Sequence, residues 1–565
     1  MSEKQGKILV IGLDGASYPM LNFWLDRGDM PNVKKLIENG ITGNVASSMP
    51  PMTAPAWNSW STGCNPGKHN VYDFMTTTKL PGRYHMVNFD TRQRRGIWEY
   101  LDEAGLVSTF QNMPSTYPPV SINGFMVSGM LTPKHRRHFG KPRQLIHEIE
   151  SKFGPYPLYF DSPMFILNLN ESLINTFIDE AIQHLTYKFN VFNYLQERLN
   201  PDFSFIHEFG NDQISHALWH IIEPDMGEYD PEMIERLREK VSSYYKMFDN
   251  YIGILMERMK ENDTLLIMSD HGFGRWHKTI ALNTWLLKNG FIKLKNRWVT
   301  KLRYKLWQKG ITHAWLFKNI VKRLANWGLR AHQRPIGEEF YRMQSRKDFL
   351  LTVRDIDWSK SVAFSTTGWG QIYINSHEKF ITGCVKTKEE YAKVYKEITE
   401  ALAKMEDPDS GPINGQIWDK HSLYNGPHVE HAPDITFSAL EKGYLATNLY
   451  GFITNEPVGE RWVFTGTHRQ KGILIGTGPY LRKTNERIEM DLQDFLPNIL
   501  YMNKLPIPVD IDGKVINNLY TEEFINGNQP VYKGSSVLKK KGLKKVFSKS
   551  EEDKIEDTLK GLGYL

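Results

Sequence analysis

The sequence predicts an α/β fold with a largely parallel central sheet flanked by helices. Apolar, strand-like runs recur along the chain, and the clearest are residues 7–13 (KILVIGL) and 264–269 (TLLIMS). Each of these two runs is followed directly by an acidic residue, Asp14 or Asp270. In open parallel sheets, ligands bind outside the carboxyl ends of the strands, so both carboxyl groups are expected at one edge of the sheet. Strand and helix patterns are mixed along the chain, which favours a single α/β core.

A helix is expected to begin near Thr53. Pro55 suits a first helical turn, where its missing N–H costs nothing, and Gly63 suits a helix end. A hydroxyl at that helix start would lie beside free backbone N–H groups and the positive end of the helix dipole, a setting that binds phosphate. Thr53 is therefore the candidate nucleophile. Helix capping is the simpler alternative for a threonine at this position.

Histidine and carboxyl groups recur near other strand-like runs. Residues 202–207 lead into Asp212 and His216, whose i,i+4 spacing puts a carboxylate and an imidazole on one helix face. Near the other end of the chain, His468 precedes the strand-like residues 472–475. These positions repeat the pattern of chemically capable side chains at the ends of apolar runs.

Each of these residues also has a simpler explanation. Asp14 and Asp270 suit helix caps, Asp212 and His216 suit a solvated pair, and His468 suits a turn. Taken together, three aspartates, three histidines and one threonine instead indicate two divalent metal ions, because carboxylates and neutral imidazoles are common zinc ligands. The seven residues are Asp14, Thr53, Asp212, His216, Asp270, His271 and His468.

These stretches resemble the alkaline phosphatase superfamily, and specifically its type I phosphodiesterase/nucleotide pyrophosphatase branch. The resemblance implies an alkaline-phosphatase-like core with an inserted cap region. It also implies a phosphoric-ester hydrolase, most simply a phosphodiesterase. The matching stretches follow the family's order and are residues 11–15 (IGLDG), 51–57 (PMTAPAW), 62–63 with 65–69 (TG, NPGKH), 211–212 with His216, 269–274 (SDHGFG) and 466–468 (GTH).

The resemblance further implies how the metal ligands divide. Every ligand position of the family is filled, by Asp14, Thr53, Asp270 and His271 for one ion and by Asp212, His216 and His468 for the other. The family usually carries zinc, and manganese or another divalent ion is the alternative.

The implied mechanism uses Thr53 as a covalent nucleophile. The pKa of an alcohol is far too high for attack at neutral pH, so coordination to the first ion would supply the alkoxide. Two ions about 4 Å apart can hold both the attacking and the leaving oxygen of an in-line displacement. Attack on phosphorus would give a phospho-threonine, which water then hydrolyses.

Two features complicate the substrate assignment. Phe74 occupies the place where nucleotide pyrophosphatases of this branch have a phosphate-binding asparagine, and Asn112 is a candidate replacement, although an Asx turn is the simpler role for it. The stretch at Cys64 is similar to the sulfatase signature but departs from it at Gly67 and Lys68, so sulfatase activity is not expected. A phosphomonoesterase or phosphonate hydrolase on the same core is the alternative enzyme. The non-enzymatic alternative is a membrane-surface binding protein with an idle metal site.

Length and composition agree with a large globular enzyme. At 565 residues the chain exceeds one typical domain, and no apolar run approaches a membrane span. Residues 1–6 lead almost directly into the first strand, which leaves no room for a signal peptide. Cys64 and Cys384 are too few for a disulfide framework, and these features predict a cytoplasmic protein.

Basic residues concentrate in one segment. Residues 293–334 contain 12 Lys or Arg, no Asp or Glu, and four tryptophans, at positions 298, 307, 315 and 327. Residues 315–329 have helical apolar spacing with basic residues between, a pattern found in helices that lie on anionic membranes. The alternative is a solvated cap whose tryptophans pack on the core. Specific nucleic-acid binding is not expected, because no recognisable binding module accompanies the basic stretch.

The organisation expected from these patterns has four parts. Residues 1–290 form the first part of the core and supply the nucleophile and most ligands, and residues 291–430 form the insertion or cap. Residues 431–520 return to the core with His468, and residues 521–565 form a basic linker followed by a helix at 551–562. The sequence does not indicate an oligomeric state.

Overall fold

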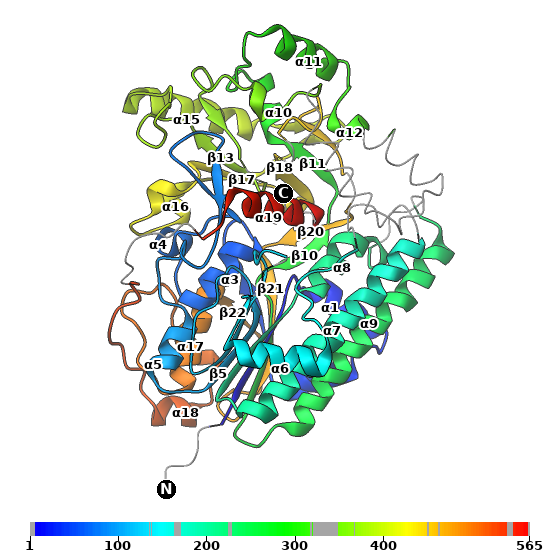
Figure 1. Ribbon diagram of the computed structural model, residues 1–565, viewed down its shortest axis with the longest axis vertical. Helices are drawn as coiled ribbons and strands as arrows, with labels where there is room; N and C mark the ends of the chain where they lie inside the picture. Colours follow the sequence, from blue (N-terminus) through cyan, green and yellow to red (C-terminus); the bar gives the residue numbers. More distant parts are fainter. Residues whose placement is uncertain are drawn as a thin grey trace.

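The computed structural model describes residues 6–134, 136, 138–162, 171–223, 229–316, 319, 349–366, 368–448, 451–461, 464–538 and 546–562. A large sheet with helices on both faces forms the lower part of the molecule, as Figure 1 shows, and a second group of strands and helices lies above it. We call this second group, residues 278–460, the upper lobe. None of the described helices is both long enough and apolar enough to cross a membrane.

The central sheet is largely parallel, which confirms the predicted fold class. Its nine strands lie in the order β22, β2, β21, β9, β1, β8, β5, β6, β7. Only β21 and β7 run antiparallel to the other seven strands. The bounds are β1 Ile8–Leu13, β2 Ile41–Ala46, β5 Ser108–Met113, β6 Gly124–Ser128, β7 Gly140–Lys141, β8 Phe203–Glu208, β9 Thr264–Met268, β21 Lys471–Thr477 and β22 Arg487–Asp491.

The apolar runs of the sequence are buried because helices cover both faces of the sheet. Successive side chains of a strand point to opposite faces, and in β1 Leu9 and Ile11 pack with one helical layer while Ile8 and Val10 pack with the other. The first layer contains α1 (Tyr18–Asp26), α2 (Pro31–Asn39), α7 (Glu171–Leu199) and α9 (Pro231–Arg258). The second layer contains α3 (Thr53–Thr62), α5 (Ile97–Glu103), α17 (Phe495–Met502) and α18 (Glu522–Gly527).

The described part of the upper lobe contains two small sheets and a two-stranded pair, β14 (Glu406–Asp407) with β15 (Gly411–Pro412). One has the strand order β18, β11, β19 and the other β12, β13, β17, β16. The strands of these two sheets are β11 Lys278–Ala281, β12 Ala363–Phe364, β13 Gln371–Ile374, β16 Gln416–Asp419, β17 Ile435–Ser438, β18 Tyr444–Thr447 and β19 Val458–Glu460. The helices of the lobe include α10 (Leu282–Lys288), α11 (Trp298–Gln308), α12 (His313–Leu316), α15 (Lys388–Ala403) and α16 (Lys420–Leu423). The lobe thus extends to both sides of the predicted cap, residues 291–430, and the domain division itself remains a prediction.

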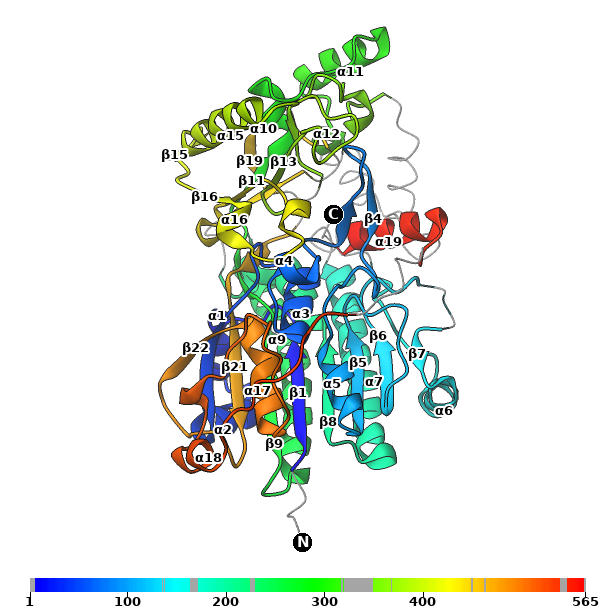
Figure 2. The same cartoon turned by 90° about the vertical axis from the view of Figure 1, so that its left-hand side faces the viewer.

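A hairpin and a helix near the C-terminus lie beside each other below the upper lobe (Figure 2). The hairpin consists of β3 (Met75–Thr77) and β4 (Tyr84–Met86), and the helix is α19 (Lys549–Gly561), close to the helix expected at 551–562. His85 Nδ1 lies 2.8 Å from Glu552 Oε1, which links the two elements. Residues 539–545 of the predicted basic linker and most of the amphipathic stretch 315–329 lie outside the described residues.

Candidate active site

The candidate site residues are brought together where strands of the sheet end. Asp14 follows β1, Asp270 and His271 follow β9, Thr53 begins α3, Asp212 and His216 lie in α8 (Gly210–Leu218), and His468 lies in β20 (Gly466–Arg469). Six of these side chains are fully buried and His216 is 3% exposed.

The structure excludes the simpler explanations for several of them. Helix α1 is preceded by Ser17 and not Asp14, and Asp270 precedes strand β10 (Gly272–Arg275) and not a helix. Asp212 and His216 are buried, so they are not a solvated pair. Met52 is the N-cap of α3, and Thr53 Oγ1 makes no hydrogen bond with the described residues. Capping therefore does not explain the threonine.

Residues on either side of Thr53 in the chain contact two other candidate site residues, His468 and Asp14. The carbonyl of Pro51, two residues before it, lies 2.7 Å from His468 Nδ1. The indole of Trp57, one turn after it, donates a hydrogen bond to Asp14 Oδ2 at 3.1 Å. Gly63 ends α3 with φ of 64°, in the left-handed conformation expected of a glycine at a helix end.

The first group of ligand candidates surrounds His271. Its Nε2 lies 3.4 Å from Asp14 Oδ1 and 3.5 Å from Asp270 Oδ2. Four buried atoms have no hydrogen-bond partner among the described residues: Asp14 Oδ1, Thr53 Oγ1, Asp270 Oδ2 and His271 Nε2. Leaving buried polar atoms unpaired is costly. These four residues are also the ones that the resemblance assigns to one metal ion.

The second group contains Asp212, His216 and His468. Asp212 Oδ1 lies 3.6 Å from His216 Nε2 and 3.3 Å from His468 Nε2, and the two Nε2 atoms lie 3.0 Å apart. The rings of His271 and His468 stack with centroids 3.6 Å apart, so the two groups are adjacent. His271 lies within reach of ligand atoms of both groups.

The three histidines share one hydrogen-bonding pattern. Their Nδ1 atoms lie 2.7–3.2 Å from backbone carbonyl oxygens, of Gly272 for His271, of Gly466 for His216 and of Pro51 for His468. When Nδ1–H donates to a carbonyl, Nε2 keeps its lone pair for a metal ion. Two such lone pairs 3.0 Å apart, on His216 and His468, repel each other unless a cation or a proton lies between them. The residues present therefore fit a pair of metal ions.

The electrostatics agree with a site built for positive charge. Burial, and then the charge of Asp212, raise the pKa of Asp14 to about 7. Burial and Asp14 raise the pKa of Asp270 well above its ordinary value. Burial also lowers the pKa of both His271 and His468 to about 4, so both imidazoles are neutral at pH 7. Neutral histidines beside carboxyl groups are a typical donor set for a divalent ion.

Sequence reasoning missed two contacts to these residues. His207 Nε2 lies 2.6 Å from Asp14 Oδ2 and orients that carboxyl group from the end of β8. Trp369 of the upper lobe packs on His468 with ring centroids 4.3 Å apart, and its φ of 69° is unusual for a residue with a side chain. His207 ends one of the apolar runs, which is a signal in the sequence, whereas nothing local to Trp369 indicates its contact.

Phe74 and Asn112, the two residues that bear on substrate choice, lie in different surroundings. Phe74 is fully buried in the main hydrophobic core. Asn112 lies in β5 at a register shift, with φ of 62°, and its Oδ1 accepts a hydrogen bond from the hydroxyl of Tyr156 at 2.6 Å.

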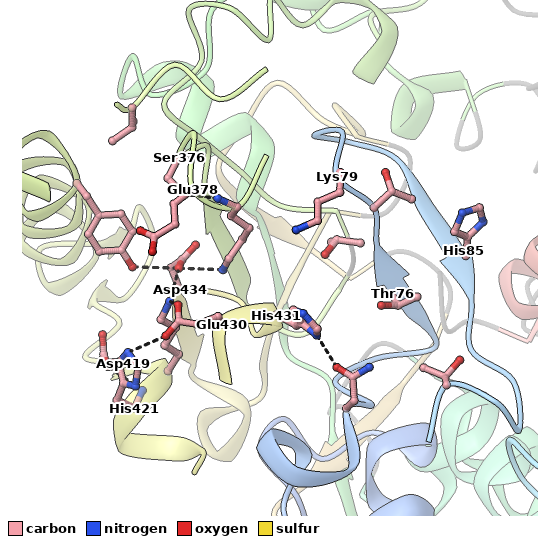
Figure 3. Close-up of a pocket in the computed structure, with 18 of the residues that line it drawn as sticks. Thr76, Lys79, His85, Ser376, Glu378, Asp419, His421, Glu430, His431 and Asp434 are labelled. Atoms are coloured by element: carbon pink, nitrogen blue, oxygen red, sulfur yellow. Dashed lines mark hydrogen bonds and ion pairs between the residues drawn. The ribbon is translucent and has the colours of Figure 1, made fainter. Parts of the chain in front are cut away.

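A cavity of about 1290 Å³ lies between the hairpin, the upper lobe and α19 (Figure 3). None of the seven candidate site residues is among the described residues that line it. Its wall holds a buried ion network in which Asp434 Oδ1 accepts from Lys379 Nζ at 2.9 Å, Lys420 Nζ at 3.3 Å and the hydroxyl of Tyr391 at 3.0 Å. Glu430 completes the network with a contact of 2.5 Å to Lys420 Nζ.

Comparison with known families matches residues 8–459 to the type I phosphodiesterase/nucleotide pyrophosphatase family. Six of the seven candidate residues lie in that range and His468 lies just beyond it. No relative was found among curated protein sequences.

Solved structures give matches at the level of fold. Phosphonoacetate hydrolase from Sinorhizobium meliloti 1021, in complex with phosphonoformate, has 13% identity and a TM-score of 0.50, with 87% of this chain and 94% of that chain covered. Murine ectonucleotide pyrophosphatase/phosphodiesterase 5 has 14% identity and a TM-score of 0.46, with 91% of this chain and all of that chain covered.

Proposed function

Because the chain belongs to the type I phosphodiesterase/nucleotide pyrophosphatase family, we propose that it is a two-metal phosphodiesterase with Thr53 as its nucleophile. The observation that carries this proposal is the set of four buried atoms that have no hydrogen-bond partner among the described residues, on Asp14, Thr53, Asp270 and His271. A threonine hydroxyl at a helix start, among unpaired carboxyl and imidazole atoms, suits attack on an electrophile that carries negative charge.

In this proposal Asp14, Thr53, Asp270 and His271 hold one divalent ion, and Asp212, His216 and His468 hold the other. When bound, the ions supply the positive charge that acidifies the Thr53 hydroxyl and balances the charge of the phosphate oxygens. The three neutral imidazoles favour zinc, and manganese is the alternative.

The chain's own residues perform the remaining steps. Thr53 Oγ1 gives its proton to water and forms a bond to phosphorus, while the bond from phosphorus to the ester oxygen breaks and that oxygen takes a proton from water and leaves as the alcohol. Water then attacks the phospho-threonine, restores the hydroxyl and releases the phosphate product. N–H groups of the first turn of α3, which have no partner within a helix, suit the phosphate oxygens, although Pro55 contributes none.

A phosphonate hydrolase or phosphomonoesterase is the second candidate. The observation that favours it is Phe74, which stands where a diesterase of this branch has an asparagine and is buried in the core. The predicted cytoplasmic location stays a prediction.

Metal analysis and a substrate screen on the purified full chain test the proposal. We expect close to two divalent ions per chain, loss of turnover with chelator, and recovery with zinc or manganese. Among nitrophenyl diester, monoester and phosphonate substrates, the diester should give the highest kcat/KM. Full turnover by metal-free protein would rule out the two-metal site, and preference for the phosphonate would select the second candidate.

A further inference from the structure

Helix α11 lies at the end of the upper lobe that is farthest from the central sheet (Figures 1 and 2). Contacts on one side of α11 fix the orientation of the helix. Thr300 and Trp307 are buried, and Thr300 Oγ1 and Arg303 Nη1 donate hydrogen bonds to Asp355 at 2.7 and 2.9 Å. The opposite face of the helix is therefore held outward.

That outward face combines large apolar side chains with lysines. Trp298 is 76% exposed and Leu302, one turn later, is 50% exposed. Lys305 and Lys309 continue the same face at helical spacing, and both are exposed. The expectation that the tryptophans of this segment pack inward holds for Trp307 and fails for Trp298.

Exposed apolar side chains and positive charge are both concentrated in the part of the upper lobe around α11. Among the described residues, ten large hydrophobic side chains are exposed, and half of them lie in this part of the lobe: Trp298, Leu302, Trp315, Phe349 and Val353. Described residues 293–316 contain seven Lys or Arg and no Asp or Glu. Arg303 pairs with Asp355 on the packed side of α11, and the residues of α11 itself, 298–308, include no acidic side chain.

We propose that the outward face of α11 docks on an anionic lipid bilayer. Interfaces between proteins are depleted in lysine and bury about 800 Å² on each partner, which a single tryptophan and leucine among lysines do not provide. Tryptophan with surrounding lysines instead suits the boundary between headgroups and acyl chains, where the indole is half wet and the ammonium groups meet anionic lipid. This docking does not depend on the proposed hydrolysis.

Vesicle sedimentation with the full chain tests the proposal. The probes are vesicles of phosphatidylcholine alone and of phosphatidylcholine with 30% phosphatidylglycerol, at low and high salt. We expect binding to the anionic vesicles at low salt and much weaker binding at high salt, because exposed charges are screened within about 10 Å at 0.1 M ionic strength.

Two pairs of variants distinguish a specific role of the outward face of α11 from an effect of changing any exposed lysine or aromatic side chain. Lys305→Glu with Lys309→Glu should weaken binding at least about tenfold, whereas Lys393→Glu with Lys396→Glu on α15, both 75% exposed, should not. Trp298→Ser should weaken binding and Tyr532→Ser, at 52% exposure in the native chain, should not.

Hydrolysis of a small soluble diester confirms that each variant is folded, and it should be unchanged. The proposal would be overturned if each control variant lost as much vesicle binding as its α11 counterpart. Binding to neutral vesicles alone, or no vesicle binding by the unmutated chain, would also overturn it. A change in oligomeric state caused by Trp298→Ser, without vesicle binding, would assign the face to a second copy of this chain. If the unmutated chain did not hydrolyse the diester at all, that result would instead count against the proposed function.

Discussion

Two clusters of charged residues differ in how their buried polar atoms are paired. The candidate active-site cluster contains Asp14, Asp212, Asp270, His216, His271 and His468. The cap ion network contains Lys379, Lys420, Glu430 and Asp434. In the network, Asp434 accepts from two lysines, from Tyr391 and from the backbone N–H of Ile374, and Lys379 also donates to the carbonyl of Ala432. In the candidate active-site cluster, Asp14 Oδ1 and Asp270 Oδ2 have no hydrogen-bond donor among the residues that the structure describes.

The pKa of Asp434 shifts in the opposite direction from the pKa values of Asp14 and Asp270. Burial raises the pKa of Asp434, but Lys379 and Lys420 outweigh it and lower that pKa below its ordinary value. Burial and a neighbouring carboxyl group raise the pKa of Asp14 and Asp270. Burial raises the pKa of Asp212 too, but His216 and His468 outweigh it and lower that pKa. A buried carboxylate that lysines compensate stays charged within the fold, whereas one left uncompensated takes up a proton or binds a cation.

The largest expected effect concerns the nucleophile. Thr53→Ala removes the attacking atom from a fully buried position and should lower turnover by several orders of magnitude without unfolding the chain. Thr53→Ser should keep measurable activity. Thr62→Ala is the matched control, because that hydroxyl is buried in the same helix and donates to the carbonyl of Asn58. A phosphoenzyme mapped to another residue would contradict the assignment.

The second effect concerns the cap ion network. Asp434→Ala leaves two lysines poorly solvated, with side-chain exposures of 11% and 8%, and should cost about 3–5 kcal/mol of unfolding free energy in chemical denaturation. Glu430→Gln is the control and should cost no more than about 1 kcal/mol, since Glu430 is 66% exposed. Folded Asp434→Ala protein should keep its metal content, and loss of metal would show that the two clusters are coupled.

A smaller effect is expected from the residue that orients Asp14. His207→Gln removes the contact to Asp14 Oδ2 and should weaken metal binding by about 10- to 100-fold, measured by calorimetry on metal-free protein. His184→Gln replaces another buried histidine, which stacks on Phe160, and should leave the affinity unchanged. Equal losses would mean that His207 acts only through folding.

Much of the core could be predicted from the sequence because its strands are continuous apolar runs. Residues 7–13, 202–207 and 264–269 correspond closely to β1, β8 and β9. The direction of β21 could not be predicted, because the apolar pattern of a buried strand is the same in parallel and antiparallel pairing. The candidate site residues could be selected from the sequence because each follows or precedes such a run.

Contacts between distant segments could not be predicted. Trp369 meets His468 only because the upper lobe folds over the strand ends, and Gly370 beside it has φ of 79° where a Cβ would lie 1.7 Å from the carbonyl oxygen of Phe437. The exposure of Trp298 likewise depends on which face of α11 meets Asp355. Neither relationship has a local signature, since both are set by tertiary packing.

The last expected effect is a dependence of metal affinity on pH, and it reports which ligands carry protons. With a pKa of about 7, Asp14 is mostly protonated below pH 7 in the metal-free protein, so an incoming cation must displace that proton. His271 and His468, with pKa values of about 4, are already neutral above pH 5 and release none. Affinity should therefore rise as the pH increases from 5 to 7, by up to about tenfold per pH unit for each proton released.

Zinc calorimetry at several pH values, in two buffers of different ionisation enthalpy, counts the released protons. Proton release that persists up to about pH 7 would identify the carboxyl groups as its source. An affinity that stops rising near pH 5 would show that the active-site carboxylates are compensated in the metal-free chain, as Asp434 is by its lysines, and the contrast between the two clusters would then be lost.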